Sequence, residues 1–159
     1  MTPTNNRLEE QLPLLLPAAI AWAEAAARDG RAAGLPLDAA RVALAESVGV
    51  RHASAIRLVV VDEFPAPSDP ALRQAGMQMG LLGAHGLGLT LGYAVFVRRG
   101  HEAGERLLRH EFRHVQQFER RGSLAAFLTE YLSQVVRFGY HDAPLEADAR
   151  AREAGEGNG

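Results

Sequence analysis

Two histidines stand four residues apart in a strongly helical segment, and a glutamate directly follows the first of them. The run is His110-Glu111-Phe112-Arg113-His114. Residues four apart on a helix lie on the same face, so both imidazoles can reach one tetrahedral metal ion. Glu111 lies about a hundred degrees round the helix, where its carboxylate can take a proton from a water molecule beside the metal. The pattern predicts one zinc ion per chain, with His110 and His114 as ligands and Glu111 as general base.

A surface helix whose histidines pair with Glu111 and neighbouring side chains is the alternative interpretation. The apolar residues around the motif favour the metal site instead. They are Leu107, Leu108, Phe112, Val115 and Phe118. They place both histidines at the margin of the core, where a polar imidazole needs a partner.

A catalytic zinc site needs a third protein ligand and keeps one position open. The chain has no cysteine, so this ligand is a histidine or an acid. The downstream candidates are Glu119, Glu130, His141, Asp142, Glu146 and Asp148. Glu119 lies too far along the histidine helix, whereas a return helix and a third helix can bring Glu146 back over the first. An ion pair of Glu146 with Arg150, four residues later, is the alternative.

Three runs carry a family resemblance, namely L-L-R-H-E-F-R-H-V-Q-Q-F-E-R-R-G, F-L-x-x-Y-L and G-Y-H-D-A-P-L-E-A-D-A. From about Gly88 to Ala154 the chain resembles the gluzincin branch of the zincin metallopeptidases. It looks most like small bacterial proteins with H-E-x-x-H-V-x-Q and a later P-x-E-x-E-A. The resemblance implies that Glu146 is the third zinc ligand. Larger gluzincins have an acid where Arg150 stands here, which hydrogen-bonds a ligand histidine, so Asp148 is the candidate for that role.

The resemblance also implies a substrate and the way in which it binds. In zincins the strand before the motif helix pairs with an extended peptide, and Leu89–Arg98 occupies that place. We therefore expect a zinc metallopeptidase with a peptide or protein partner bound by strand addition. The reaction needs a further hydrogen-bond donor to the oxyanion. The candidates are His101, Tyr131, Tyr140 and His141, each equally well explained as a packing or surface residue. Gln117 is either a partner of the site or a polar rim residue.

The elements that position these residues predict an α+β chain. Ile56–Asp62 and Leu89–Arg98 are β-branched and predict a small sheet packed against the motif helix. Helices are predicted over Pro17–Asp29, Ala39–Ser47, Pro70–Gln78, Glu105–Arg121 and Leu124–Phe138, and from Pro144 to about Ala154. The N-caps are Asp38, Ser123 and Asp142, and Gly30 ends the first helix. The glycine-dense stretch over 76–92 lacks the Lys-Ser/Thr of a phosphate loop and predicts a mobile loop that leads into a strand.

We expect one zincin-like domain over residues 8–154, with a helical N-terminal part (8–50) and a metal-site core (88–154). Disordered ends are predicted over 1–7 and 155–159. The apolar stretch Leu12–Ala23 is interrupted by two prolines and preceded by acids, so it predicts neither a signal peptide nor a membrane span. We expect a cytoplasmic protein without a membrane partner.

Two other functions compete with hydrolysis. The first is an interaction module that keeps zinc but turns over no substrate, for which a closed fourth position would argue. The second is a nucleic-acid-associated protein, suggested by Arg98, Arg99, Arg106, Arg109, Arg113, Arg120 and Arg121. Interspersed glutamates dilute this cluster, no aromatic side chains are placed for base stacking, and the net charge is −2. We therefore expect no nucleic-acid partner.

Overall fold

The structure is a computed structural model that describes residues 3–81 and 86–155. Six α-helices and a four-stranded mixed sheet make up this part of the chain, which confirms the α+β class. The helices are α1 (Pro3–Ala33), α2 (Ala39–Ser47), α3 (Pro70–Gln78), α4 (Glu105–Arg121), α5 (Leu124–Phe138) and α6 (Pro144–Ala151), and a single 3-10 turn covers Ala53–Ala55. The strands are β1 (Leu35–Pro36), β2 (Arg57–Val61), β3 (Gly88–Leu91) and β4 (Ala94–Arg98).

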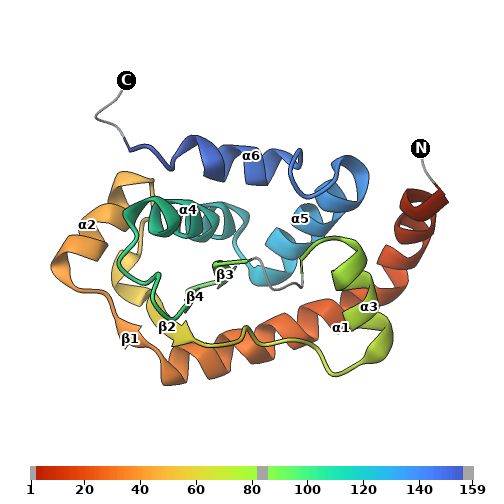
Figure 1. The fold of residues 1–159 in the computed structure, drawn as a ribbon, viewed down its shortest axis with the longest axis horizontal. Coiled ribbons are helices and arrows are strands. Elements are labelled where there is room, and N and C mark those ends of the chain that lie inside the picture. The colour runs from red at the N-terminus through yellow and green to blue at the C-terminus, as the bar shows by residue number, and fades with distance from the viewer. Residues whose placement is uncertain (1–2, 82–85, 156–159) are drawn as a thin grey trace.

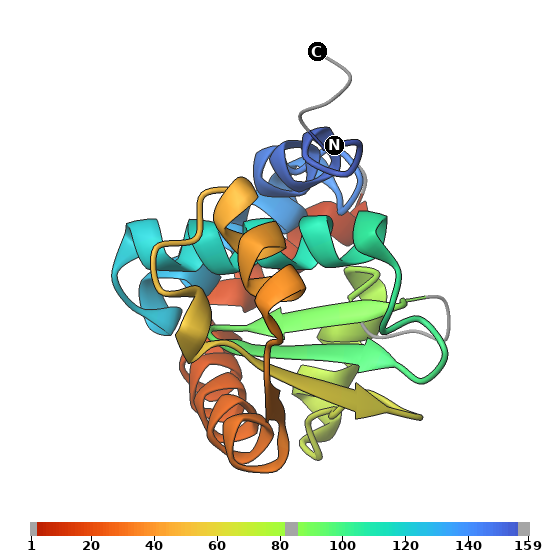
Figure 2. The same ribbon diagram turned by 90° about the vertical axis from the view of Figure 1, so that its left-hand side faces the viewer.

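The sheet has the order β1-β2-β4-β3. Its two central strands, β2 and β4, run parallel, and each outer strand is antiparallel to its neighbour. Helix α1 covers one face of the sheet and α4 lies against the other, with α6 on the far side of α4 (Figure 1). The turned view shows the same succession of layers (Figure 2). In the described part of the chain, β3 is the edge strand closest to α4.

Alternation along β4 divides the core between the two faces of the sheet. Val95 and Val97 point toward α2 and α4, where they meet Phe112 and Val115 in one buried cluster. The intervening residues of β4 point the other way, into a second cluster with α1 and α5. Successive side chains of a strand lie on opposite faces, so a strand covered on both sides reads as a continuous apolar run. The motif helix is therefore fixed to the sheet through its apolar face.

The four central helices keep their predicted bounds because local signals set their ends. Asp38 accepts a hydrogen bond from the backbone N–H of Arg41, and Ser123 accepts one from Ala126. Gly122 ends α4 in the left-handed conformation, with φ of 88°. Asp142 is not an N-cap, however, since Ala143 occupies that position in α6 and Pro144 begins the helix.

Leu89–Arg98 is not one strand but a hairpin. Strand β3 ends at Leu91, β4 begins at Ala94, and the two pair antiparallel. Gly92 has φ of 65°, which places glycine at the first of the two turn positions. The prediction was wrong because an apolar residue stands at every second position from Leu89 to Val97, as in a single strand. The turn itself contains neither Asn nor Asp. Of the two strands in this hairpin, only β3 has an edge that no described strand pairs with, since β4 pairs on both sides.

The first helix is longer than predicted at both ends. It begins at Pro3, so the described residues of the predicted disordered segment 1–7 are helical, and it contains Pro13 and Pro17. A proline within a helix costs about 3 kcal/mol, but contacts of α1 with α5 and the sheet offset that cost. Residues 82–85 and 156–159, which belong to the predicted loop and tail, lie outside the described residues. No described helix is both long and apolar enough to cross a membrane.

Gly30 lies inside α1 rather than at its end, because the helix approaches β4 there. A Cβ at this position would lie 2.6 Å from Cζ of Phe96 and 3.1 Å from Cβ of Ala94. Helix propensity favours alanine over glycine by about 1 kcal/mol, whereas overpacking a core costs about 1–3 kcal/mol. We predict that Gly30→Ala lowers the free energy of unfolding by about 1 kcal/mol in urea denaturation. Ala32→Ser, at an exposed position of α1, is the control. A more stable Gly30→Ala protein would contradict this packing.

Candidate metal centre

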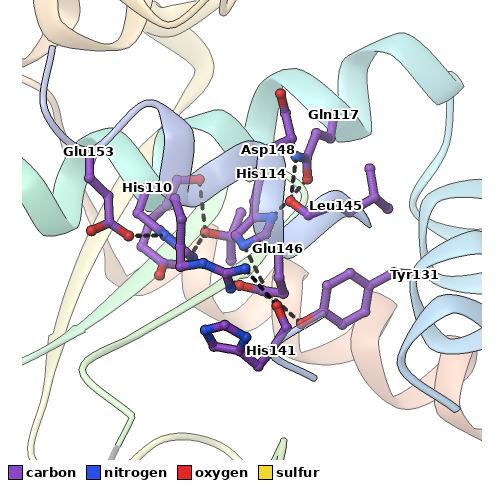
Figure 3. A network of polar contacts seen from close by, with 12 residues as sticks. His110, His114, Gln117, Tyr131, His141, Leu145, Glu146, Asp148 and Glu153 are labelled. Atoms are coloured by element: carbon purple, nitrogen blue, oxygen red, sulfur yellow. Dashed lines mark hydrogen bonds and ion pairs between the residues drawn. The ribbon is translucent and has the colours of Figure 1, made fainter. Parts of the chain in front are cut away.

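Three side chains from two helices converge on one point inside the molecule. His110 and His114 come from α4, and Glu146 comes from the first turn of α6. The Nε2 atoms of the two histidines lie 3.1 Å from Oε1 and 3.1 Å from Oε2 of Glu146, respectively. One ligand atom from each residue lies within 4.8 Å of the other two. Glu146 is only 2 % exposed. Figure 3 shows the three side chains pointing toward one another.

The helical hairpin formed by α4 and α5 brings Glu146 to the histidines. Gly122 and Ser123 reverse the chain between these two helices. Gly139, with φ of 84°, ends α5, and α6 then packs across α4. The side-chain oxygen of Gln134 on α5 accepts a hydrogen bond of 2.9 Å from the backbone N–H of Leu145 and fixes the start of α6. This is the return path that was predicted for Glu146.

Gln117 determines the orientation of His114. Its side-chain amide nitrogen donates to the carbonyl oxygen of Leu145 and to Oδ2 of Asp148, at 2.9 Å each. The amide oxygen is therefore turned toward His114, whose Nδ1 lies 2.8 Å away. Because that oxygen only accepts, Nδ1 of His114 carries a proton, a tautomer assigned from the hydrogen-bond network. Gln117 is thus a buried partner of the site, and Asp148 reaches the histidine only through it.

Glu153 determines the orientation of His110. Its Oε2 lies 2.9 Å from Nδ1 of the imidazole, so the carboxylate accepts the Nδ1 proton. Arg106 holds the other carboxylate oxygen at 2.8 Å. Histidines that bind metal usually donate their second ring nitrogen to a carboxylate or carbonyl, which fixes the ring and its tautomer. The acid was expected at Asp148, but Glu153 fills this role.

The contacts between the two Nε2 atoms and the carboxylate of Glu146 require positive charge between the atoms. With Nδ1 protonated, the Nε2 atom of a neutral imidazole carries a lone pair, and here it faces a carboxylate oxygen at 3.1 Å. Two lone pairs repel, so each contact requires a proton or a cation between the atoms. Two nitrogens and one carboxylate oxygen, each with an ordered partner, form a ligand set that suits zinc. The residues present therefore fit the ion.

The pKa values of His110, His114 and Glu146 are shifted in the directions that bring positive charge to the carboxylate. Burial favours neutral rings, but the contacts with Glu146, together with the charge of Glu111, raise the pKa of His110 to about 9. The same balance raises the pKa of His114. Burial also opposes the charge of Glu146, yet the hydrogen bonds of both histidines and Tyr131 lower the pKa of its carboxyl far below the ordinary value. The site therefore attracts positive charge, and a bound divalent cation would supply it without protonating the rings.

Tyr131 positions the carboxylate. Its hydroxyl donates to Oε2 of Glu146 at 2.6 Å, so this group is engaged with the predicted metal ligand. Burial and the nearby carboxylate raise the pKa of Tyr131 well above its ordinary value, which keeps the hydroxyl a donor. Its ring also stacks on Phe127 of the same helix. Figure 3 shows the hydroxyl directed at Glu146.

Glu111 lies beside the three candidate ligands, against the edge strand. It is 6 % exposed, and its Oε1 accepts a hydrogen bond of 2.8 Å from the hydroxyl of Thr90. Gly88 permits this approach, because a Cβ there would lie 2.7 Å from Cδ of Glu111. Glu111, His114 and Glu146 all line the same cavity. The carboxylate predicted as general base therefore faces a space that a substrate can enter.

The other ligand candidates have partners elsewhere. Glu119 accepts hydrogen bonds from the backbone N–H groups of Arg51 and His52 and from Tyr93. Glu130 pairs with Arg121, and Asp148 pairs with Arg113. His141 is exposed and contacts Asp142. The alternative ion pair between Glu146 and Arg150 does not form either, since Arg150 donates to the carbonyl of His141.

Sequence reasoning missed three residues of the site, namely Gly88, Thr90 and Glu153. Glu153 stands seven residues after Glu146. In the structure α6 ends at Ala151 and Glu153 follows it in a turn, so its approach to His110 depends on how that turn packs on α4. Gly88 and Thr90 act through the packing of β3 on α4, which no local pattern encodes.

Comparison with protein-family models, curated proteins and solved structures finds no significant match to this chain. The chemical interpretation of the centre therefore rests on its geometry.

Removal of the Glu153 side chain should weaken zinc binding without abolishing it. Loss of a partner of a ligand histidine typically costs about tenfold or more in metal affinity, and we predict that size of effect for Glu153→Ala in a competition titration against a zinc chelator. Glu105→Ala is the matched control, because it removes the same charge from an exposed side chain that pairs with Arg109 on α4. Equal affinities of the two variants would show that Glu153 does not support His110.

Proposed function

We propose that the chain binds one zinc ion through His110, His114 and Glu146 and hydrolyses an amide bond, such as a peptide bond, with Glu111 as general base. One observation carries this proposal. Both Nε2 atoms face the same buried carboxylate, while acceptors hold the proton on both Nδ1 atoms. A neutral pair of histidines without a bound cation would instead direct both Nε2 lone pairs at the carboxylate.

The ligand set also suits hydrolysis by its charge. Two neutral imidazoles and one carboxylate leave a net positive charge on a bound zinc ion. The ion then supplies Lewis acidity, which polarises a carbonyl group and makes a water molecule more acidic. The remaining steps depend on groups of the chain around the cavity.

Glu111 is suited to accept the proton of the attacking water. The hydroxyl of Thr90 holds Oε1, so Oε2 is the oxygen left to take up a proton. After the water adds to the carbonyl carbon, the same carboxyl group can give this proton to the leaving nitrogen as the C–N bond breaks. The backbone carbonyl of Glu111 also accepts from Thr90, at 3.1 Å, which holds α4 and β3 at a fixed spacing.

Tyr140 is the best candidate for the donor to the oxyanion. It lines the cavity with Glu111 and Glu146, whereas the hydroxyl of Tyr131 is engaged with Glu146. His101 and His141 are exposed and do not line this cavity. Burial and the two carboxylates raise the pKa of Tyr140, so the phenol keeps its proton at neutral pH. A neutral hydroxyl beside the scissile carbonyl can stabilise the developing negative charge.

The free edge of β3 is the place where an extended peptide would pair. Strand β3 also lines the cavity next to Glu111. Four residues of edge can hold only a short stretch of backbone, which is less than the predicted strand Leu89–Arg98 offered.

Neither competing function is favoured. A purely structural zinc site is closed by four protein ligands, whereas the described residues offer three beside a cavity. Among the arginines of the proposed nucleic-acid surface, Arg98, Arg99, Arg106, Arg109, Arg113 and Arg121 make hydrogen bonds to acids or carbonyls of the chain. Their charge is therefore largely compensated within the protein.

Zinc content tests the ligand assignment. Protein prepared without chelators should contain one zinc ion per chain by elemental analysis, and the double variant His110→Ala/His114→Ala should contain none. Glu146→Ala should weaken zinc binding by about tenfold or more, and Asp148→Ala should have a smaller effect because it touches no ligand directly. Equal metal content in the wild type and the double variant would sink the proposal.

Substitution of Glu111 separates metal binding from catalysis. Glu111→Gln keeps the size of the side chain and should leave the zinc content unchanged. Hydrolysis should fall by about a hundredfold or more, because the amide cannot accept a proton. The control is Glu105→Gln, on the exposed side of the same helix. Full activity of Glu111→Gln on any substrate that the wild type cleaves would refute its role as base.

The two tyrosines should respond differently to loss of the hydroxyl. Tyr140→Phe should lower kcat by about a hundredfold, the usual order for loss of an oxyanion donor, with unchanged zinc affinity. Tyr131→Phe should weaken zinc binding instead, because its hydroxyl holds Glu146. Steady-state kinetics and chelator titration of both variants provide the comparison. If Tyr140→Phe turns over normally, another group stabilises the oxyanion.

A further inference from the structure

A large apolar cavity opens directly beside the metal centre. Its volume is about 840 Å³, which lies near the upper end of the roughly 300–1,000 Å³ common for small-molecule sites. The site residues Glu111, His114 and Glu146 form part of its wall. The cavity is thus continuous with the place where the reaction is proposed to occur.

Elements far from the motif supply most of the remaining wall. Helix α1 contributes Leu12, Leu15 and Trp22, α3 and its C-cap contribute Leu72 and Met79, and α5 contributes Leu128 and Leu132. Leu8 of α1, Ala75 of α3 and Val136 of α5 form a buried cluster that joins the three helices. Residues 8–23 and 63–80 therefore contribute much of the wall of this chamber.

The wall offers few partners for a polar ligand. Apart from Thr90, Tyr131, Tyr140 and the residues of the candidate metal centre, the described lining residues with polar side-chain atoms are Gln11, Trp22, Glu63 and Arg98. Arg98 already donates to the backbone carbonyls of Asp62 and Gly86. A peptide segment that filled the chamber would leave amide groups unpaired against apolar side chains, which is unfavourable. A hydrocarbon chain carries no such groups.

We propose that the substrate is an amide of a long-chain acyl group, whose hydrocarbon chain occupies this chamber. The identity of the cleaved bond rests on the proposed function, whereas binding of the chain does not. In the reaction, water adds its oxygen to the acyl carbon and the C–N bond breaks. The proton taken up by Glu111 passes to the nitrogen, so the products are a fatty acid and an amine.

Binding can be measured without turnover, because the chain has a single tryptophan and Trp22 lines the chamber. The zinc-loaded Glu111→Gln protein is titrated with N-acetyl-, N-octanoyl- and N-dodecanoylglycine below their micelle concentrations, and Trp22 fluorescence is recorded. We expect no response to the acetyl compound. Binding of the longer compounds should tighten by roughly tenfold for every two methylenes. An equal response to all three compounds would overturn the proposal.

Two pairs of neighbouring positions provide matched variants. Met79 lines the chamber, whereas Met77 on the same segment is 58 % exposed. Ala19 lines the chamber, whereas the adjacent Ala18 is exposed. In the Glu111→Gln background, Met79→Glu and Ala19→Phe should each weaken N-dodecanoylglycine by tenfold or more, through a buried charge and through lost volume. Met77→Glu and Ala18→Phe should leave the affinity within about twofold. Equal effects within both pairs would show that the chain binds elsewhere.

Hydrolysis by the wild type distinguishes failure of this inference from failure of the proposed function. Release of glycine that increases with acyl length and disappears in Glu111→Gln supports both. Length-dependent binding without release of glycine supports the chamber and contradicts the amide hydrolase. Cleavage of acetylated peptides that is unaffected by Met79→Glu supports the hydrolase and overturns the acyl-chain proposal. Preferential cleavage of long apolar peptides over the acyl compounds also overturns it.

Discussion

The two imidazoles of α4 face a carboxylate of α6 inside the molecule, and this contact needs positive charge between the atoms. Glu153 and Gln117 hold the Nδ1 protons and leave the Nε2 atoms directed at Glu146. Both imidazoles come from one helix, so helix geometry sets the spacing of the two residues, and Glu153 and Gln117 orient the rings. The position of the carboxylate, in contrast, depends on the whole path through α5.

The packing of the helices on the sheet brings the histidines and Glu146 together. The apolar face of α4 packs on the sheet through Phe112 and Val115, so its polar face turns toward α6 and the cavity. The contact of Thr90 with Glu111 then joins the edge strand to the same helix. Helices α1, α3 and α5 enclose an apolar space on the open side of the site. Glu111, His114 and Glu146 therefore belong both to the candidate metal centre and to the wall of this cavity.

Sequence patterns predicted the parts of this arrangement that depend on neighbours in the chain. The spacing of His110 and His114 and the cap at Ser123 are local, and α4 and α5 have the predicted bounds. The hairpin turn at Gly92 was missed because apolar residues stand at every second position on both sides of it. The long α1 was missed because tertiary contacts outweigh its prolines. The position of Glu153, in the turn after α6, and the apolar chamber depend on how separate segments pack, which residue spacing does not reveal.

The tautomers of the two histidines provide the most direct test of the metal centre. Protein with histidine labelled by the heavy nitrogen isotope can be titrated with zinc while the ring nitrogens are observed by NMR. At one equivalent of zinc, the Nε2 resonances of His110 and His114 should move to metal-bound positions, both Nδ1 atoms should stay protonated, and the other histidines should not respond. Binding of zinc through either Nδ1 atom, or a response confined to other histidines, would contradict the account.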